Sequence, residues 1–184
     1  MSSTARRIAI FIMLCFALGT TRCALASQIP EYRVKAAFLF NFSQFVSWPP
    51  RAFSSAGAPL VIAVLGDNPF GSDLDAIVSG ERVDGHPLVV RLYSDVSQVD
   101  RCHILFITRS ETSQLPEILR ALRGRAILTV SDINGSARNG VMIDLVTQNS
   151  RIRMHVNVAA ARASGLAISA QLLRLAQIIG PKVD

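Results

Sequence analysis

The stretch LVIAVLGDNP, Leu60 to Pro69, decides the fold of this chain. Its first six residues form a continuous apolar run rich in Val and Ile, which is typical of a strand buried on both faces of a parallel sheet. Asn68-Pro69 is a good helix start, because Asn caps a first turn and Pro suits the first helical position. We therefore predict a strand over 60–65 that leads into a short helix over 74–78.

The same alternation continues towards the C-terminus. Strands are predicted at 88–92, 104–107 and 126–130, with a brief helical or irregular crossover at 94–100 and a helix over 114–123 that Gly124 closes. This order of strands and helices predicts an α/β fold with a doubly wound, mostly parallel sheet and helices on both faces.

After this unit the pattern changes. Residues 131–140 carry Asn134-Gly135 and Asn139-Gly140 and are predicted to form a loop. Two strands follow at 141–146 and 151–158, and the second alternates apolar with polar residues, as expected in an antiparallel pair. We place this hairpin at the edge of the sheet, followed by short helices at 159–164 and 169–178.

A broad apolar stripe at helical spacing precedes the sheet. Residues 32–46 lack Gly and Pro, and Phe38, Phe42 and Phe45 are expected to point inward. The polar residues of the run, Arg33, Lys35, Ser43 and Gln44, are assigned to other faces. The segment is too polar and too short to span a bilayer, and Pro49 and Pro50 end it.

Residues 1–26 have the layout of a secretory signal peptide. Arg6 and Arg7 precede an apolar run over 8–18, and small residues lead to a predicted cleavage between Ala26 and Ser27. The alternative is a membrane anchor, but the run is too short to cross about 30 Å of hydrocarbon. We therefore expect an exported, periplasmic protein with one domain over 27–184 and no transmembrane segment in the mature chain.

Charge and cysteine usage restrict the function further. Cleavage would remove three arginines and no acid, so the net charge falls from +6 to +3. The remaining arginines form no basic stripe with interleaved aromatics, so we expect no nucleic-acid partner. Cys102 would be the lone thiol, either a core side chain or a redox sensor, without an intrachain disulfide. The three histidines show no ligand-type spacing, so no metal or other cofactor is predicted.

The chain lacks recognisable catalytic motifs. It has neither Gly-x-Ser-x-Gly nor a Gly-Lys-Ser phosphate loop, so we predict no catalytic residues and no enzyme. In open α/β sheets ligands bind at the carboxyl edge. A turn or a helix cap is the simpler explanation of the Gly66 loop and of Asp132. The ligand-edge candidates are Gly66, Asp67, Thr108, Arg109, Ser131 and Asp132.

A series of segments extends over almost the whole chain after the leader: VKAAFLFNFSQFVSWPP at 34–50, then VIAVLGDNPFG, CHILFI, TVSD, GVMIDL, RIRMHVNVAAARASGLAIS and QLLRLAQII. In order and spacing these segments resemble the YfiR family, also known as DUF4154. The resemblance implies an α/β domain that binds the periplasmic region of a membrane-bound diguanylate cyclase and represses it, which lowers cyclic di-GMP and biofilm formation. It also implies an OmpA-like outer-membrane lipoprotein as a second partner, and a possible homodimer.

One departure matters, because the best-known branch of the family carries disulfides. With Cys102 alone, this chain cannot sense redox state through an intrachain bond. As candidates for partner binding we take Trp48, Pro49, Arg51 and Phe53, since aromatic residues and arginine are common interface anchors. The alternative for Trp48 is a place beneath the first helix, as a cap on the core. The rival function is a periplasmic small-ligand-binding protein that uses the carboxyl edge of the sheet.

Overall fold

The computed structural model describes residues 30–180, so the predicted leader lies outside the described residues. The helices are α2 (Glu31–Phe45), α3 (Asp73–Val78), α4 (Leu115–Ala121), α5 (Val158–Ala163) and α6 (Ala170–Leu173), with 3-10 turns at η2 (Pro50–Ala52), η3 (Val96–Gln98), η4 (Arg109–Gln114) and η5 (Ser136–Asn139). The strands are β1 (Val46–Ser47), β2 (Leu60–Leu65), β3 (Arg82–Val83), β4 (His86–Tyr93), β5 (Ile104–Ile107), β6 (Leu128–Ser131), β7 (Ile143–Gln148), β8 (Arg151–Val156), β9 (Ala167–Ile168) and β10 (Gln177–Ile178).

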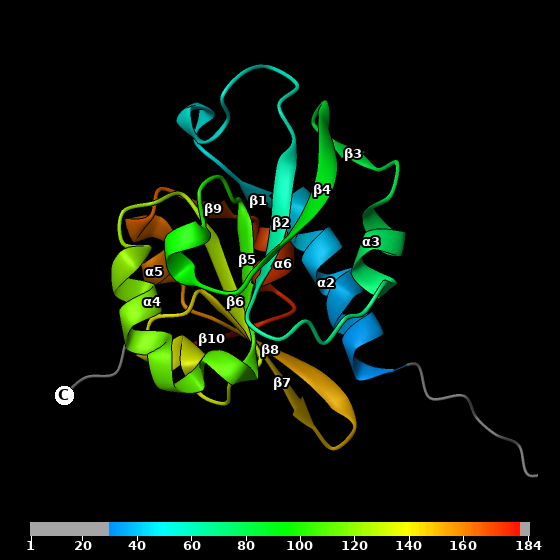
Figure 1. Cartoon of the computed structure of the whole chain (residues 1–184). Coiled ribbons are helices and arrows are strands. Elements are labelled where there is room, and N and C mark those ends of the chain that lie inside the picture. The colour runs from blue at the N-terminus through cyan, green and yellow to red at the C-terminus, as the bar shows by residue number, and fades with distance from the viewer. Residues whose placement is uncertain (1–29, 181–184) are drawn as a thin grey trace, which may run out of the picture.

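An eight-stranded open sheet in the order β10-β8-β7-β6-β5-β2-β4-β3 forms the centre of the molecule (Figure 1). Strand β2 pairs in parallel with β4 on one side and with β5 on the other, so the strand order reverses at β2. Strands β6 and β7 continue the parallel run, and β8 returns antiparallel to β7. The prediction of a doubly wound, mostly parallel α/β sheet is therefore confirmed.

The alternating side chains of the strands build a core on each face of the sheet. On one face, Ile62, Val64 and Phe106 pack with apolar residues of α2, α3, α5 and α6. On the other face, Leu65 and Ile107 pack with the buried stripe of α4. All six residues of β2 are buried, as the uninterrupted apolar run over 60–65 predicts.

The C-terminal segment differs from the prediction. The helix expected over 169–178 begins after Ser169, whose hydroxyl caps it, but ends at Leu173. Gln177 and Ile178 instead form β10, which pairs in parallel with His155 and Val156 of β8. The predicted hairpin is present as β7 and β8, but this added strand places it one position in from the edge. The backbone N–H and C=O groups of β8 need hydrogen-bond partners, and pairing with them outweighs the weak helix preference of residues 174–178.

The first helix also corrects two assignments. Phe42 is fully buried, whereas Phe38 and Phe45 are half-buried against the core rather than inside it. Lys35 and Ser43, assigned by sequence to other faces, are buried. Within residues 30–180, no helix has both the length and the apolar character needed to cross a membrane.

Candidate functional site

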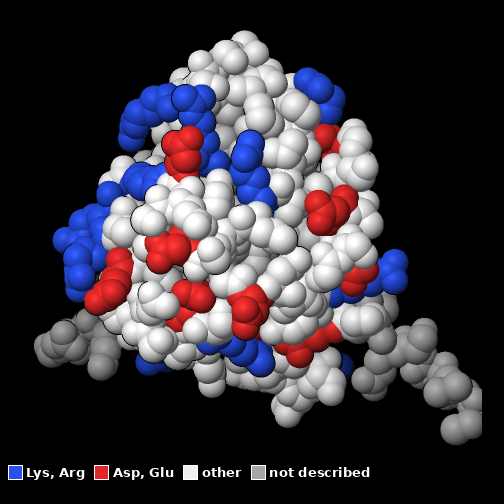
Figure 2. All heavy atoms as spheres, viewed as in Figure 1, with Lys and Arg blue, Asp and Glu red and all other residues white. Residues whose placement is uncertain are grey.

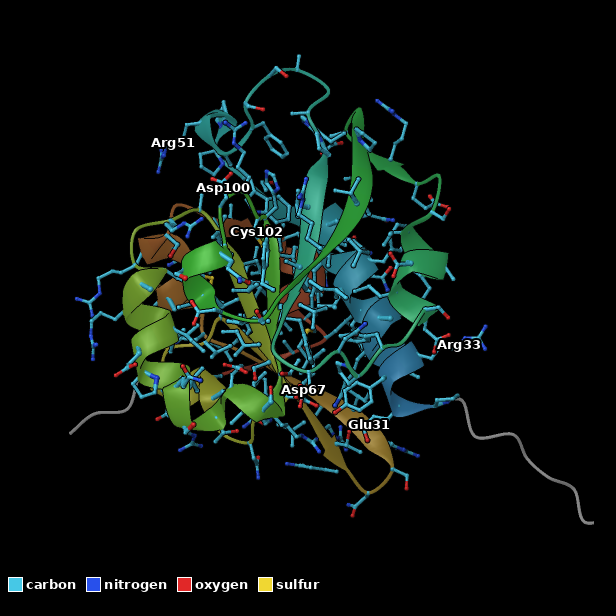
Figure 3. All side chains as sticks on the ribbon, in the orientation of Figure 1. Glu31, Arg33, Arg51, Asp67, Asp100 and Cys102 are labelled. Atoms are coloured by element: carbon cyan, nitrogen blue, oxygen red, sulfur yellow. The ribbon has the colours of Figure 1, made fainter. Side chains whose placement is uncertain are left out.

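The segment after α2 holds the residues predicted to bind a partner. Strand β1 pairs antiparallel with β9, and the following turn η2 begins with Pro50 at its first position, where Pro is favoured. The Trp48 indole N–H donates to the carbonyl oxygen of His103 at 3.2 Å, and the two rings meet edge to face. Trp48 is thus half-buried and anchored to the start of β5, while Arg51 is exposed and extends outward (Figure 3).

Phe53 is held between two imidazole rings. Its centroid lies 3.8 Å from that of His86 and 4.4 Å from that of His103, with both pairs stacked. His103 is buried; its Nδ1 accepts from the Val61 N–H at 3.0 Å, so its Nε2 donates to the Ala52 oxygen at 3.2 Å. Burial lowers the pKa of His103 below its usual range, so this ring is neutral and fixes the segment to the sheet.

A buried ion pair lies at the carboxyl edge of the sheet. Asp132, directly after β6, accepts a hydrogen bond on Oδ2 from Lys35 Nζ at 2.7 Å and another from the Tyr32 hydroxyl at 2.9 Å. The side chains of Lys35 and Asp132 are both fully buried. Burial, followed by the Asp132 carboxylate, raises the pKa of Tyr32 to about 12, so the phenol stays a donor.

Two further charged groups extend this pair to the surface. Glu31 forms an ion pair with Lys35 one turn along α2, and that contact is the main reason why the pKa of Glu31 is lowered. Arg109 Nε lies 3.3 Å from Asp132 Oδ2, and its side chain is 59% exposed. The resulting group of two acids, two bases and one phenol ties the first helix to the ends of β5 and β6.

Neighbouring polar side chains fill the space beside Gly66. Thr108 Oγ1 donates to the Leu65 oxygen at 3.0 Å, and the Ser110 hydroxyl donates to Glu111 Oε1 at 2.9 Å and accepts from the Asp67 N–H at 3.1 Å. A side chain at position 66 would meet these atoms at 2.3–2.6 Å. Glycine is required here by close approach and by a φ of +93°.

The predicted ligand-edge residues are therefore brought together, but most of them contact one another. Ser131 is buried with its hydroxyl on the Ile107 oxygen at 2.8 Å, and Asp132 is held by α2. Only Asp67 and Arg109 of this group are exposed. The edge is closed by contacts within the chain, which suits a structural role of these residues.

Cys102 is buried just before β5, and its thiol lies 3.0 Å from the Ile104 carbonyl oxygen. Burial raises the pKa of Cys102 to about 12, because a thiolate would lose its hydration there. The Cys102 thiol is therefore protonated at neutral pH.

Sequence reasoning missed Lys35, Tyr32 and Glu31 as members of the charged group. The signal lay in helical phase: Lys35, Leu39 and Phe42 are spaced by four and three residues, so a lysine stands on the buried stripe. A lysine in that position needs a buried acid as partner, and Asp132 was already placed at the sheet edge, as a ligand-edge candidate.

Comparison with known proteins gives one family. A search of curated proteins found no match to the chain. The family model described as DUF4154, YfiR/HmsC-like, matches residues 32–177, from the first helix to the start of β10. At the family level this supports a periplasmic, non-catalytic regulator of cyclic di-GMP signalling. The chain therefore belongs to the YfiR/HmsC-like family.

Proposed function

We propose that this protein is an exported regulator that binds the periplasmic region of an inner-membrane diguanylate cyclase and represses it. The observation that carries the proposal is the family match over residues 32–177, because it extends from the second residue of α2 to the first residue of β10. Repression requires no chemistry from the chain. It requires only that the regulator binds the inactive state of the cyclase more tightly than the active state.

The segment Trp48–Phe53 supports this proposal as the partner-binding surface. Trp48 and Phe53 are held by fixed contacts with His103, so their positions cost little entropy on binding. Pro50 and Arg51 next to them are exposed. A rigid aromatic base with an exposed Pro-Arg turn has the composition of an interface anchor.

Deletion of the gene tests the repressor function. Cyclic di-GMP, measured in extracts, should rise on deletion together with surface attachment, and expression of the full chain should restore both. An unchanged cyclic di-GMP level in the deletion strain would contradict the proposal.

Direct binding is tested by co-purification of the tagged full chain with the periplasmic region of the cyclase. The same experiment with the OmpA-like lipoprotein of the cell tests the second partner, which should compete with the cyclase. Sedimentation of the purified protein without partners measures whether it forms a homodimer. If the chain binds the lipoprotein but not the cyclase, repression by direct contact is rejected.

Export is part of the proposal. The protein should appear in the periplasmic fraction with the intact mass of a chain that begins at Ser27. An uncleaved protein, with residues 1–26 still present, in the membrane fraction would instead support the membrane-anchor alternative.

A second candidate function is small-ligand binding at the carboxyl edge. It is favoured by one observation: the buried Asp132 Oδ1 has no hydrogen-bond partner among the described residues, and the exposed Arg109 lies beside this carboxylate. Thermal shift against a metabolite panel tests it. Stabilisation that disappears in Arg109→Ala would support this function, and no shift by any metabolite would count against it.

A further inference from the structure

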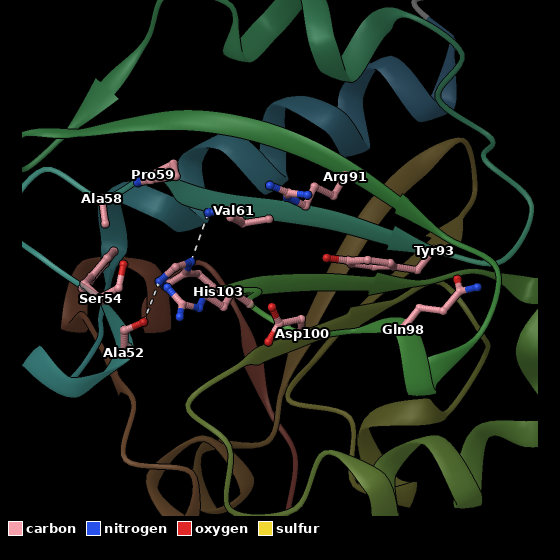
Figure 4. Close-up of a pocket in the computed structure, with 12 residues that line it drawn as sticks. Ala52, Ser54, Ala58, Pro59, Val61, Arg91, Tyr93, Gln98, Asp100 and His103 are labelled. Atoms are coloured by element: carbon pink, nitrogen blue, oxygen red, sulfur yellow. Dashed lines mark hydrogen bonds between the residues drawn. The ribbon is translucent and has the colours of Figure 1, made fainter.

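A cavity of about 330 Å³ lies beside Phe53, on the sheet face opposite α2 (Figure 4). The loop over 52–59 forms one wall, and β2 and β4 form the floor through Val61, Arg91 and Tyr93. Arg91 and Tyr93 stand two residues apart on β4, so both side chains point to the same face. The segment over 98–101, just before β5, closes the far side.

The polar lining of this cavity carries an excess of positive charge. Arg91 and Arg101 are exposed, and neither forms an ion pair with any residue in the 30–180 range. The only lining acid is Asp100, whose backbone carbonyl accepts from the Arg125 guanidinium. Figure 2 shows Lys and Arg side chains gathered at the upper left of the face on view, and Figure 3 places Arg51 and Asp100 in that region.

The apolar lining is rigid. The Phe53 ring is stacked between His86 and His103, and His103 is fixed by one hydrogen bond accepted at Nδ1 and one donated from Nε2. Ala58 and Pro59 complete this wall, with the Ala58 oxygen 2.6 Å from His86 Nδ1. A preformed apolar wall lowers the ordering cost on the protein side, because a bound carboxylate would fix only the exposed side chains of Arg91 and Arg101.

We propose that this cavity is the place where the protein partner inserts an acidic side chain, with Arg91 and Arg101 as its counter-charges. This inference rests on the proposed function, because it assigns the partner's chemistry to the surface that includes Phe53. The occupant is a protein segment that carries Asp or Glu. Guanidinium groups pair with carboxylates in bidentate geometry, and Arg51 in the neighbouring turn is also exposed.

Two features favour a protein segment over a free metabolite. The volume is at the lower end of the range for small-molecule pockets, which suits one inserted side chain. The cavity is also continuous with the exposed turn at Pro50 and Arg51, since Ala52 and Phe53 belong to both. A partner that covers this turn therefore meets the cavity in the same contact.

The first experiment uses the purified protein and defined peptide probes. Fluorescence anisotropy should detect binding of a labelled hexaglutamate peptide but not of the matched hexaglutamine peptide. Binding should weaken on the order of tenfold in Arg91→Glu/Arg101→Glu and weaken with added salt. Asp100→Asn should bind the acidic peptide more tightly, because it removes the opposing charge. Unchanged affinity in both variants would overturn the proposal.

Controls separate the cavity from net charge and from folding. Arg33→Glu/Arg151→Glu changes net charge equally at two exposed arginines outside the cavity lining. This control variant should keep most of the affinity for the acidic peptide. A loss as large as that of Arg91→Glu/Arg101→Glu would show that only overall charge matters and would reject the cavity as the binding site. Each variant is first checked for an unchanged melting temperature, with Arg91→Gln/Arg101→Gln as the milder replacement if the reversal unfolds the protein.

The second experiment uses cells and keeps the two proposals apart. In the deletion strain, Arg91→Glu/Arg101→Glu should fail to restore low cyclic di-GMP, whereas Arg33→Glu/Arg151→Glu should restore it at an equal protein level. If the wild-type gene itself changes nothing, the proposed function fails. If wild type and the Arg91/Arg101 variant repress equally, the function stands and the cavity is not the contact.

Discussion

Lys35 Nζ lies 2.7 Å from Asp132 Oδ2, and both side chains are fully buried although they stand 97 residues apart in the sequence. This contact joins the first helix to the carboxyl end of β6. A buried charge without its partner is costly, while an intact pair with further hydrogen bonds is tolerated. The pair therefore fixes where α2 sits on the sheet.

The first prediction concerns this pair. Asp132→Asn and Lys35→Met should each lower the free energy of unfolding by about 3 kcal/mol, because each leaves a buried charge without its buried partner. Only the partly exposed Glu31 would then remain beside Lys35, or the exposed Arg109 beside Asp132. The double variant should lose much less than the sum of the two, which urea unfolding measures. Asp84→Asn, at an exposed turn, is the control that should change little. Additive losses would show that the two charges are not coupled.

The second prediction concerns Gly66. Gly66→Ala should cost roughly 3 kcal/mol, because its methyl group would lie 2.3 Å from Ser110 Oγ at a φ of +93°. Gly71→Ala is a matched control with a φ of +55° and nothing within 4 Å, and it should cost only about 1–2 kcal/mol. Chemical denaturation measures both. Equal costs would show that backbone strain alone matters and that the space beside Gly66 can open.

The third prediction concerns Asp144, which faces His155 across the β7–β8 pair at 3.8 Å. Burial raises the pKa of Asp144 above its usual 3.8, against the opposing effects of His155 and of the backbone N–H groups of Ala137 and Gly135. A raised pKa in the folded state means that this group contributes stability below pH 3.8 and that the contribution is lost as the pH rises through the folded pKa.

Asp144→Asn should therefore raise the melting temperature at pH 7, and the gain should vanish when the pH falls to about 3.8. Thermal unfolding followed by circular dichroism across this pH range measures the effect. A lower melting temperature at pH 7 would show that the carboxylate makes a favourable contact, for example with the His155 ring.

The fourth prediction concerns Cys102. With a pKa raised to about 12 by burial, its thiol should react with iodoacetamide far more slowly in the folded protein at pH 8 than in denaturant. Mass spectrometry of the Cys102 peptide measures both rates. Fast labelling of the folded protein would show that the segment just before β5 opens, and would support a redox role for Cys102.

Local pattern was enough to predict the sheet. The run over 60–65 is buried along its whole length, and each later strand from β4 to β6 follows within two residues of its predicted start. Buried parallel strands need continuous apolar runs, so their positions are written in short segments of sequence. The short β1, β3, β9 and β10 escaped notice, because two residues carry no period. The pairing of β1, β9 and β10 also depends on distant backbone groups.

The candidate sites were predictable only in part. Sequence reasoning named Trp48 and Phe53 as neighbours in one segment, yet it gave no sign that His86 and His103 would enclose Phe53. It named Asp132 at the sheet edge but placed Lys35 on a polar face. Each of these contacts joins residues far apart in the chain. A local sequence pattern does not specify which distant side chain packs against a given residue.

The sequence by itself determined the order of the longer strands and helices, the doubly wound class and the family, because these depend on hydrophobic period, turn residues and the order of motifs. The tertiary structure alone decided that Lys35 meets Asp132, that the sheet edge beside Gly66 is filled, and that Arg91 and Arg101 share a cavity with Phe53. The physical reason is that burial and charge pairing depend on which surfaces come together on folding, and a one-dimensional pattern specifies surfaces but not their partners.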